Sequence, residues 1–428
     1  MFTHTQLVEV RFQNQTVGAL AADQAAGAYR FEYDPAWRAR HIELAPLHMP
    51  TRGRTTSFVF PNLPEATYHR LPALIADSLP DDFGNTLIDA WMARQGVQAS
   101  EVTPLDRLAY LGSRGMGALT FHPLIERAAD TPSSLELNEL VTVARAALSG
   151  NLESVTETLA DMLAVGTSAG GARAKAILNI QPDSGDIRHG GTPIEGYEPW
   201  LLKFDGVGAD SALGASHAYG RIEYAYHLMA LDAGIAMTES RLLEEGGRAH
   251  FLTRRFDRHT DGSRTHFQTL CAMAHLDFRS PRAHDYAQLF TTIDALNLDV
   301  DARVEAFRRM LFNILASNCD DHTKNIAFAM DNDGQWGLAP AYDVTYAHNP
   351  QGEWTAAHQM GVAGEYAMPT RKHVMELADR FAIPYAADHV DAVATTVREF
   401  EAFAQVAGLD EATVAQIRTR LDQVWAHF

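Results

Sequence analysis

The stretch SNCDDHTKN, residues 317–325, decides how the rest of this chain is interpreted. It follows segment 300–317, whose apolar residues recur at helical spacing and predict a long helix. Asp320 and Asn325 stand five positions apart in it, with basic residues between them. The residues that follow predict a hairpin, with strands 326–330 and 335–338, and then lead to Asp343. A hairpin of this kind brings an amide and a second carboxylate to one end of a small sheet.

The interval between Asp320 and Asn325 is that of a kinase catalytic loop. In such a loop the Asp accepts the proton of an attacking hydroxyl, and the Asn holds magnesium on the nucleotide phosphates. Asp343 is then the candidate for a further magnesium ligand. Because Asp and Asn are also common caps and turn formers, the motif alone is equally compatible with an ordinary turn. The segments that precede it decide between the two interpretations.

Composition limits the classes of partner. The chain has 428 residues, 46% of them hydrophobic, and a net charge of -19 from 35 basic and 54 acidic residues. Such a charge opposes direct binding to nucleic acid or to an anionic membrane, so we expect any contact with DNA to come through a partner. Two cysteines are too few for a disulfide framework, and neither a signal peptide nor a membrane-spanning run is visible. These features predict a cytoplasmic globular protein.

Segment patterns predict an α+β fold in three parts. Strands at 7–12, 17–20 and 29–33, a helix at 81–91 and a turn and strand within 111–121 predict a β-rich unit. Helices are expected further along the chain, at 135–148, 152–165, 217–233, 280–297, 300–317, 373–381, 389–406 and 411–427. Residues 242–256 predict another hairpin. We expect a β-rich subdomain at 1–125, a nucleotide-binding lobe at 126–256 and a helical lobe at 257–428.

Two segments before the central loop suit a nucleotide. The run GTSAGGARAK, residues 166–175, is rich in small residues and carries Arg173 and Lys175. Glycine lets backbone amides approach a phosphate closely, although a helix C-cap followed by a turn explains such a run more often. In the predicted strand 198–204, Lys203 lies among apolar residues and needs an anion nearby. Glu223, on the following helix, is its expected partner, and a solvated Glu on a helix flank is the commoner alternative.

The order of these features is that of a two-lobed protein kinase, which supplies charge neutralisation and in-line placement from both lobes. In this scheme Lys203 binds the α and β phosphates and is oriented by Glu223. Asn325 and Asp343 hold magnesium, and Asp320 accepts the hydroxyl proton. The neighbours Asp321, His322 and Lys324 are assigned to loop shaping or phosphate contact. The chain departs from eukaryotic-type kinases, since no His-Arg precedes Asp320 and Val-Thr, not Phe-Gly, follows Asp343.

Taken together, the segments resemble the HipA-type serine/threonine kinases of bacterial toxin–antitoxin systems. The motifs that carry the resemblance are SAGGARAK at 168–175, WLLKF at 200–204, RFDR at 255–258, DDHTKN at 320–325 and PAYD at 340–343. The resemblance covers most of the chain, and its catalytic segment is the specific part.

The resemblance implies ATP and magnesium as cofactors. It also implies that Ser168 is an autophosphorylation site that switches the kinase off, because phosphoserine brings negative charge into a pocket meant for triphosphate. The nucleotide site that it implies consists of Gly170, Gly171, Ala172, Arg173, Ala174, Lys175, Lys203, Arg254, Arg255, Phe256, His322, Lys324, Asn325, Tyr342 and Asp343. Residues 254–256 would form the hinge between the lobes.

Members of this family are neutralised by a small helix-turn-helix antitoxin, HipB-like, through which the pair binds operator DNA. The resemblance therefore implies such a partner, and a translation component such as an aminoacyl-tRNA synthetase as the protein substrate, with growth arrest as the outcome. Two alternatives stay open from the residues: a kinase-fold phosphotransferase that acts on a small molecule, and a non-catalytic repressor subunit that has kept the fold.

Overall fold

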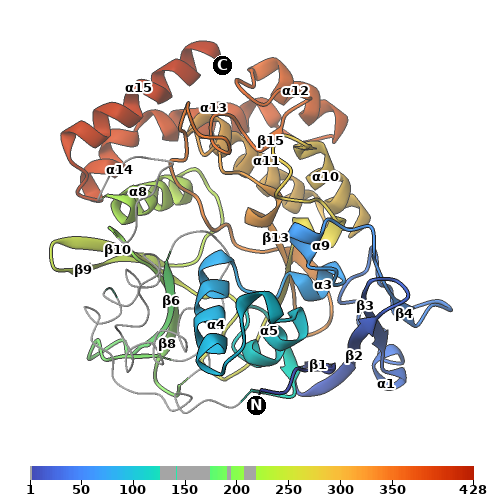
Figure 1. Cartoon of the computed structure of the whole chain (residues 1–428). Coiled ribbons are helices and arrows are strands. Elements are labelled where there is room, and N and C mark those ends of the chain that lie inside the picture. The colour runs from blue at the N-terminus through green and yellow to red at the C-terminus, as the bar shows by residue number, and fades with distance from the viewer. Residues whose placement is uncertain (1, 126–140, 142–173, 190–193, 207–217) are drawn as a thin grey trace. The chain divides into compact units, whose positions relative to one another are not determined.

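A computed structural model describes residues 2–125, 141, 174–189, 194–206 and 218–428 (Figure 1). The predicted helices at 135–148 and 152–165, together with Ser168 and the run Gly170, Gly171, Ala172 and Arg173, lie outside the described residues. The chain divides into two compact units, each built from several segments. The first contains 1–208, 252–268 and 330–335, and the second contains 209–251, 269–329 and 336–428.

An antiparallel sheet forms the beginning of the first unit, with strands in the order β4-β3-β2-β1-β5. The strands are β1 Leu7–Phe12, β2 Gln15–Asp23, β3 Ala28–Tyr33, β4 Ser57–Phe58 and β5 Leu119–His122. In β1 every second side chain is buried, at Val8, Val10 and Phe12, as expected for a strand with one covered face. The turn residues Gln13 and Asn14 have positive φ, which matches the twist of a tight hairpin.

Short helices accompany this sheet. They are α1 Pro35–Arg38, α2 Glu65–Tyr68, α3 Ala73–Ala76, α4 Asp82–Arg94, the 3-10 turn η1 Ala99–Glu101 and α5 Pro104–Leu111. The predicted helix at 81–91 is therefore confirmed as α4. Asp81 caps it, since its carboxylate accepts a hydrogen bond from the Gly84 amide at 2.7 Å.

Three further strands of the first unit pair antiparallel. They are β6 Lys175–Ile180, β7 Ile187–His189 and β8 Glu198–Lys203. Trp200, Leu202 and Phe204 are buried, as the alternation in the sequence predicts. Lys175 and Lys203 lie directly opposite each other in this ladder, so two ammonium-bearing residues meet at one end of the β6–β8 pair.

The second unit begins with α8 Tyr219–Asp232 and the hairpin of β9 Ser240–Glu245 and β10 Arg248–Arg254, whose last three residues belong to the first unit. Neither β11 His266–Thr269, whose first three residues belong to the first unit, nor the short helix α9 Leu270–Ala274 was predicted. The strand β12 His284–Asp285 pairs parallel with β15 Met360–Gly361. The predicted hairpin after the central loop is confirmed as β13 Ala327–Met330 and β14 Trp336–Leu338.

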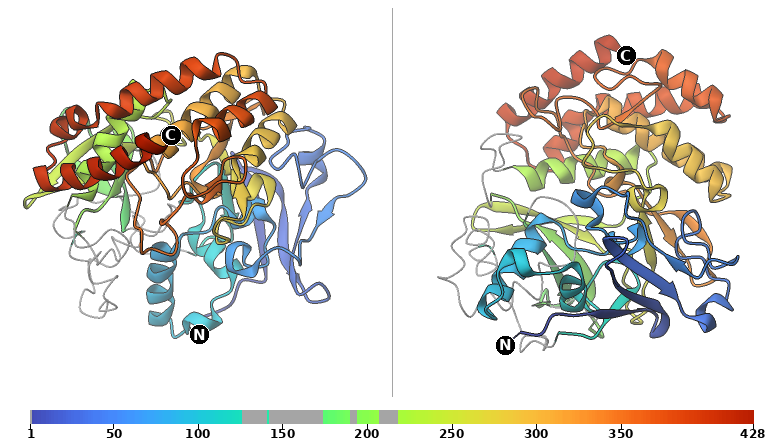
Figure 2. Two further views of the ribbon diagram at one scale, coloured as in Figure 1. Left: turned by 90° about the horizontal axis from the view of Figure 1, so that it is seen from above. Right: turned by 45° about the vertical axis from the view of Figure 1, so that its right-hand side comes forward.

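Helices dominate the rest of this unit. They are α10 Tyr286–Ala295, α11 Val300–Leu315, α12 Arg371–Arg380, α13 Ala386–Arg398, α14 Phe400–Val406 and α15 Glu411–His427. Figure 2 shows α13, α14 and α15 packed together, and α11 contacts both α13 and α15. Phe307, Leu311 and Ile314 of α11 are buried, as its apolar spacing predicts.

Two predicted helix boundaries are wrong. The helix expected at 280–297 begins only at Tyr286, because Asp285 accepts a hydrogen bond from the Ala287 amide and forms a capping box with Gln288. The helix expected at 389–406 is two helices, α13 and α14, which meet at Glu399. The predicted fold class is confirmed, with a β-rich N-terminal part and a helical C-terminal part that also carries short strands.

Candidate functional site

The central loop leaves α11 through a backbone conformation that ends the helix. Ser317 is buried and has a φ of 55°, in the left-handed region that commonly terminates helices. Asn318 forms a parallel bridge with Ala347, in which the Cys319 amide donates to the Ala347 carbonyl at 3.1 Å and the Ala347 amide donates to the Ser317 carbonyl at 3.2 Å. The start of the loop is thus fixed by backbone hydrogen bonds to a segment that follows Asp343.

Asp320 and Asn325 are joined across the loop. The Asn325 side-chain amide nitrogen donates to the Asp320 carbonyl at 2.8 Å, and residues Thr323–Asn325 form a 3-10 turn, η3, between them. The Asp320 side chain is 45% exposed, and its carboxylate lies 3.9 Å from His322 Nε2. Because the amide nitrogen of Asn325 is committed to Asp320, its oxygen is the atom that can serve as a ligand.

Asp343 is held in an unusual backbone conformation. Its φ is 54°, which is uncommon for a residue other than glycine and occurs often at functional sites. Just before it, the Ala341 amide donates to the Ala236 carbonyl at 2.8 Å, and the Tyr342 hydroxyl donates to the Lys324 carbonyl at 2.8 Å. Tyr342 therefore links the segment before Asp343 to the central loop, so the position of Asp343 depends on that loop.

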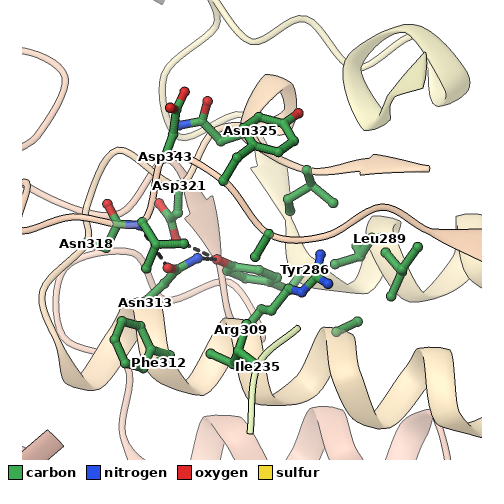
Figure 3. A pocket seen from close by; sticks show the side chains of 16 residues that line it. Ile235, Tyr286, Leu289, Arg309, Phe312, Asn313, Asn318, Asp321, Asn325 and Asp343 are labelled. Carbon is green, nitrogen blue, oxygen red and sulfur yellow. Dashed lines mark hydrogen bonds between the residues drawn. The ribbon is translucent and has the colours of Figure 1, made fainter. Parts of the chain in front are cut away.

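A small pocket in the second unit contains Asn325 and Asp343 among its lining residues (Figure 3). Its volume is about 30 Å³, which has room for water-sized ligands and is too small for a nucleotide. Asp321, Asn313 and Tyr286 also line it. The two predicted magnesium ligands are therefore brought together, whereas a nucleotide would have to bind outside this pocket.

The donor atoms of this pocket suit magnesium. Mg²⁺ prefers oxygen ligands and is held in many enzymes by one or two protein side chains, with waters and substrate phosphates completing the octahedron. The Asn325 amide oxygen and the Asp343 carboxylate form such a set. Across the described part of the chain there is no cluster of three or more His, Cys, Asp or Glu side chains of the kind that holds zinc.

Asp321, next to Asp320, is fully buried, and its carboxylate accepts hydrogen bonds from the Tyr286 hydroxyl, from His358 and from the Gln359 amide. This agrees with loop shaping, one of the two roles expected from the sequence. Lys324 and His322 contact Phe278, whose ring centre lies 5.1 Å from Lys324 Nζ and 5.3 Å from the centre of the His322 ring. No pattern in the sequence pointed to Phe278.

In the first unit, Lys175 forms a buried ion pair. Its Nζ lies 2.7 Å from Asp81 Oδ2, and the two side chains are 3% and 6% exposed. Lys175 is thus joined to the N-cap of α4, and its expected contact with nucleotide stays a prediction. Its neighbour Ala174 is buried. In the sequence Asp81 shows only the signal of a helix cap, and nothing there points to its pairing with Lys175.

The candidate hinge residues are occupied by local contacts. Arg254 pairs with Glu198 at 3.1 Å, and the Phe256 ring packs edge-on against Phe267 at 5.3 Å. Arg255 is buried and donates two hydrogen bonds to the Asp257 carboxylate, at 2.8 and 2.7 Å. Any nucleotide contact of Arg255 would therefore use its backbone.

Lys203 belongs to the first unit, whereas Glu223 is buried on α8 of the second. Their ion pair stays a prediction, as does the convergence of Lys203 with Asp320, Asn325 and Asp343.

Burial and neighbouring charges shift the pKa values of two groups around the loop, Cys319 and Arg309. Burial raises the pKa of the Cys319 thiol well above its usual range, and the nearby Asp321 carboxylate adds to the effect. Cys319 therefore stays a neutral thiol in this position. Burial also lowers the pKa of Arg309, which lines the pocket and pairs with Glu305 at 2.8 Å.

Two family models match the sequence. Residues 167–412 match the model of the HipA-like C-terminal domain, and residues 8–122 match that of the HipA N-terminal domain. No curated protein matches the sequence significantly. Among the described helices, none is long and apolar enough to cross a bilayer.

Two solved structures are similar to the chain. HipA of Shewanella oneidensis MR-1, solved with HipB and its operator DNA, is 16% identical, with a TM-score of 0.68 over 98% of this chain and 96% of its own. At that identity the likeness shows a shared fold. The Helicobacter pylori proinflammatory kinase CtkA is 13% identical, with a TM-score of 0.32 over 50% of this chain and 90% of its own, which is too low to support an argument.

Proposed function

The chain belongs to the HipA family, and from this premise we propose that it is a serine/threonine protein kinase that uses ATP and magnesium. The observation that carries the proposal is the loop geometry. The Asn325 side chain is hydrogen bonded to the backbone of Asp320, and Asn325 lines one pocket together with Asp343. Phosphoryl transfer requires a base for the hydroxyl and oxygen ligands for magnesium, held in a fixed relation to each other.

Asp320 is the proposed catalytic base. Its carboxylate is exposed, so a hydroxyl of a protein substrate can reach it and transfer a proton to it. Asn325 and Asp343 would hold magnesium, which, when bound, neutralises charge on the phosphates. The hydrogen bond from Asn325 to Asp320 keeps the base at a fixed distance from the metal ligands.

The nucleotide phosphates would be neutralised by Lys203, with Glu223 as its orienting partner. Lys203 lies opposite Lys175 in the β6–β8 ladder. The two ammonium groups repel each other, and together they attract an anion. We infer that the Lys203 ammonium contacts the phosphates. The remaining proposed contacts come from Gly170, Gly171, Ala172, Arg173, Ala174 and Lys175, from the hinge 254–256, and from His322, Lys324 and Tyr342 on the second unit.

The proposed biological setting is a toxin–antitoxin pair. A small HipB-like helix-turn-helix protein would be the partner and would carry the contact with operator DNA, since a net charge of -19 opposes direct contact. Autophosphorylation at Ser168 would switch the kinase off. An aminoacyl-tRNA synthetase is the proposed substrate, and growth arrest the proposed result.

Phosphoproteomics after induced expression tests this function in one experiment. The intact protein is compared with Asp343→Asn, which keeps the size of the side chain and removes its charge. We expect a small set of serine or threonine sites, Ser168 among them, that is modified by the intact protein and absent with the variant. Identical phosphopeptide sets from both proteins would contradict the proposed function.

A further inference from the structure

A buried carboxylate lies directly beside the proposed base. The Asp321 side chain is fully buried, whereas that of Asp320 is 45% exposed. Its Oδ2 accepts hydrogen bonds from the Tyr286 hydroxyl at 2.8 Å and from His358 Nδ1 at 3.1 Å, and its Oδ1 accepts one from the Gln359 amide at 2.7 Å. A buried carboxylate is costly unless such donors surround it, so these three contacts depend on Asp321 and it depends on them.

The hydrogen bonds continue from Asp321 back to the start of the central loop. The Tyr286 hydroxyl also accepts from the Asn313 side chain at 2.9 Å, and Asn313 in turn accepts from the Asn318 side chain at 2.9 Å. Figure 3 shows Tyr286 between Asn313 and Asp321, with dashed lines to both. Asn318, Asn313, Tyr286 and Asp321 thus join α11, α10 and the loop in one polar network.

His358 and Gln359 come from the segment that follows the proposed magnesium ligand Asp343, residues 344–361. This segment is attached to its surroundings at several places, three of which matter here. Ala347 bridges Asn318, His358 and Gln359 hold Asp321, and β15 pairs with β12. The first two attachments are to the central loop itself, so the segment and the loop form one assembly.

The segment offers no fully exposed hydroxyl for modification. Within residues 344–361 the hydroxyl side chains are Thr345, Tyr346 and Thr355. Tyr346 and Thr355 are buried, and Thr345 is half-buried. In many kinases the segment that follows the metal-binding Asp is ordered by phosphorylation, through new pairs between arginine and phosphate. Here the Asp321 carboxylate, which belongs to the central loop, is hydrogen bonded to His358 and Gln359 of the segment.

We propose that Asp321 is a positioning residue, whose carboxylate clamps segment 344–361 to the central loop and so holds Asp320, Asn325 and Asp343 in their working arrangement. The clamp makes phosphorylation of the segment unnecessary for activity. The proposal rests on the proposed function for its kinetic part, and on the geometry alone for its structural part. Asp321 lines the same pocket as Asn325 and Asp343, but its carboxylate is held by the Tyr286 hydroxyl, His358 and the Gln359 amide, so we assign it to positioning and not to contact with the substrate hydroxyl.

Kinetics of Asp321→Asn test the clamp. Asparagine has nearly the same shape, but its NH2 group replaces one of the two acceptor oxygens. That group faces either the Gln359 amide or the Tyr286 and His358 donors, so at least one of these hydrogen bonds is lost. We expect kcat to fall about 100-fold, the cost of a small misplacement of the reacting groups, while KM for ATP stays within about twofold. Asp333→Asn, the same chemical change on an exposed turn, is the matched control and should keep full activity.

Amide hydrogen exchange provides a readout that does not need activity. In Asp321→Asn, exchange should rise in segment 344–361 and stay unchanged in α15. Tyr286→Phe removes only one of the three donors and is the milder variant, with an expected loss of about tenfold in kcat, a fraction of the full misplacement cost. If Asp321→Asn fails to fold, Tyr286→Phe decides the question by the same two measurements.

A third variant carries Thr345→Val, Tyr346→Phe and Thr355→Val together and cannot be phosphorylated in the segment. We expect this variant to keep kcat within about threefold, because it leaves the Asp321 clamp intact. A misplacement of the reacting groups would lower kcat by far more than threefold. Wild-type kcat and wild-type exchange in both Asp321→Asn and Tyr286→Phe would overturn the clamp, and so would an inactive triple variant with normal exchange. If the unaltered protein transfers no phosphoryl group, the proposed function fails, and the exchange measurements still decide the clamp.

Discussion

Replacing Lys175 by methionine should destabilise the first unit strongly. Lys175 lies at the start of β6 and pairs with Asp81 at 2.7 Å, with both side chains almost fully buried. Methionine keeps the length and the apolar stem of lysine and removes the charge. The Asp81 carboxylate would then remain buried without this ammonium, while it still caps α4 through the Gly84 amide.

The magnitude follows from the burial. Breaking a buried ion pair by removing one partner costs about 3–5 kcal/mol, because the remaining charge is left uncompensated. For a unit of 150–250 residues, each kcal/mol lowers Tm by roughly 2–4 °C, so we expect a fall of roughly 10 °C. Asp81→Ser removes the other charge and keeps a side chain that can cap α4. The double variant buries neither charge, so it should lose less stability than the two single variants together.

Thermal unfolding of the four proteins, combined with amide exchange in α4 and β6, measures this coupling. We expect an interaction free energy of at least about 1 kcal/mol, as for other residues in direct contact. A Lys175→Met protein with unchanged Tm and weaker ATP binding would refute the reasoning, because it would show that Lys175 serves the nucleotide and not the fold.

Three other perturbations test the described contacts. Burial opposes ionisation of Asp257, but the Arg255 and Arg258 guanidiniums outweigh it and hold its pKa well below the usual range, so Asp257→Asn should cost about 3–5 kcal/mol in denaturant unfolding. Burial lowers the pKa of His266 to about 4 in the folded state, whereas in the unfolded state it is about 6.5. As the pH falls, the unfolded state therefore binds a proton first, and the free energy of unfolding should fall by about 3 kcal/mol between pH 6.5 and 4. His266→Phe should flatten that dependence, and an unchanged slope would contradict it. Gly220→Ala should cost about 1–3 kcal/mol in thermal unfolding, because a Cβ there collides with a carbonyl of β10.

The central loop could be predicted because its chemistry is local in sequence. The interval between Asp320 and Asn325 and the hairpin that follows them are contained in a short stretch, and the observed hydrogen bond between the two residues needs no distant partner. The start of α10 was misplaced although Asp285 and Gln288 carry the capping-box pattern.

Contacts between distant parts of the chain could not be predicted from one sequence. Nothing near Lys175 points to Asp81, and nothing near Asp321 points to His358 or Gln359. The break between α13 and α14 has no proline or glycine to announce it. Tertiary packing decides such features, and local propensity carries little information about them.

Transfer of labelled γ-phosphate from ATP to a protein hydroxyl, with magnesium and with Asp320→Ala as the paired variant, tests the central claim most directly. The account predicts label on serine or threonine with the unaltered protein. With the variant, the rate of labelling should fall by at least about 100-fold, which is the contribution that general-base catalysis typically makes. Nucleotide affinity should be retained by the variant, since Asp320 contacts the hydroxyl and not the phosphates. Equal labelling by the two proteins, or none by the unaltered protein, would contradict it.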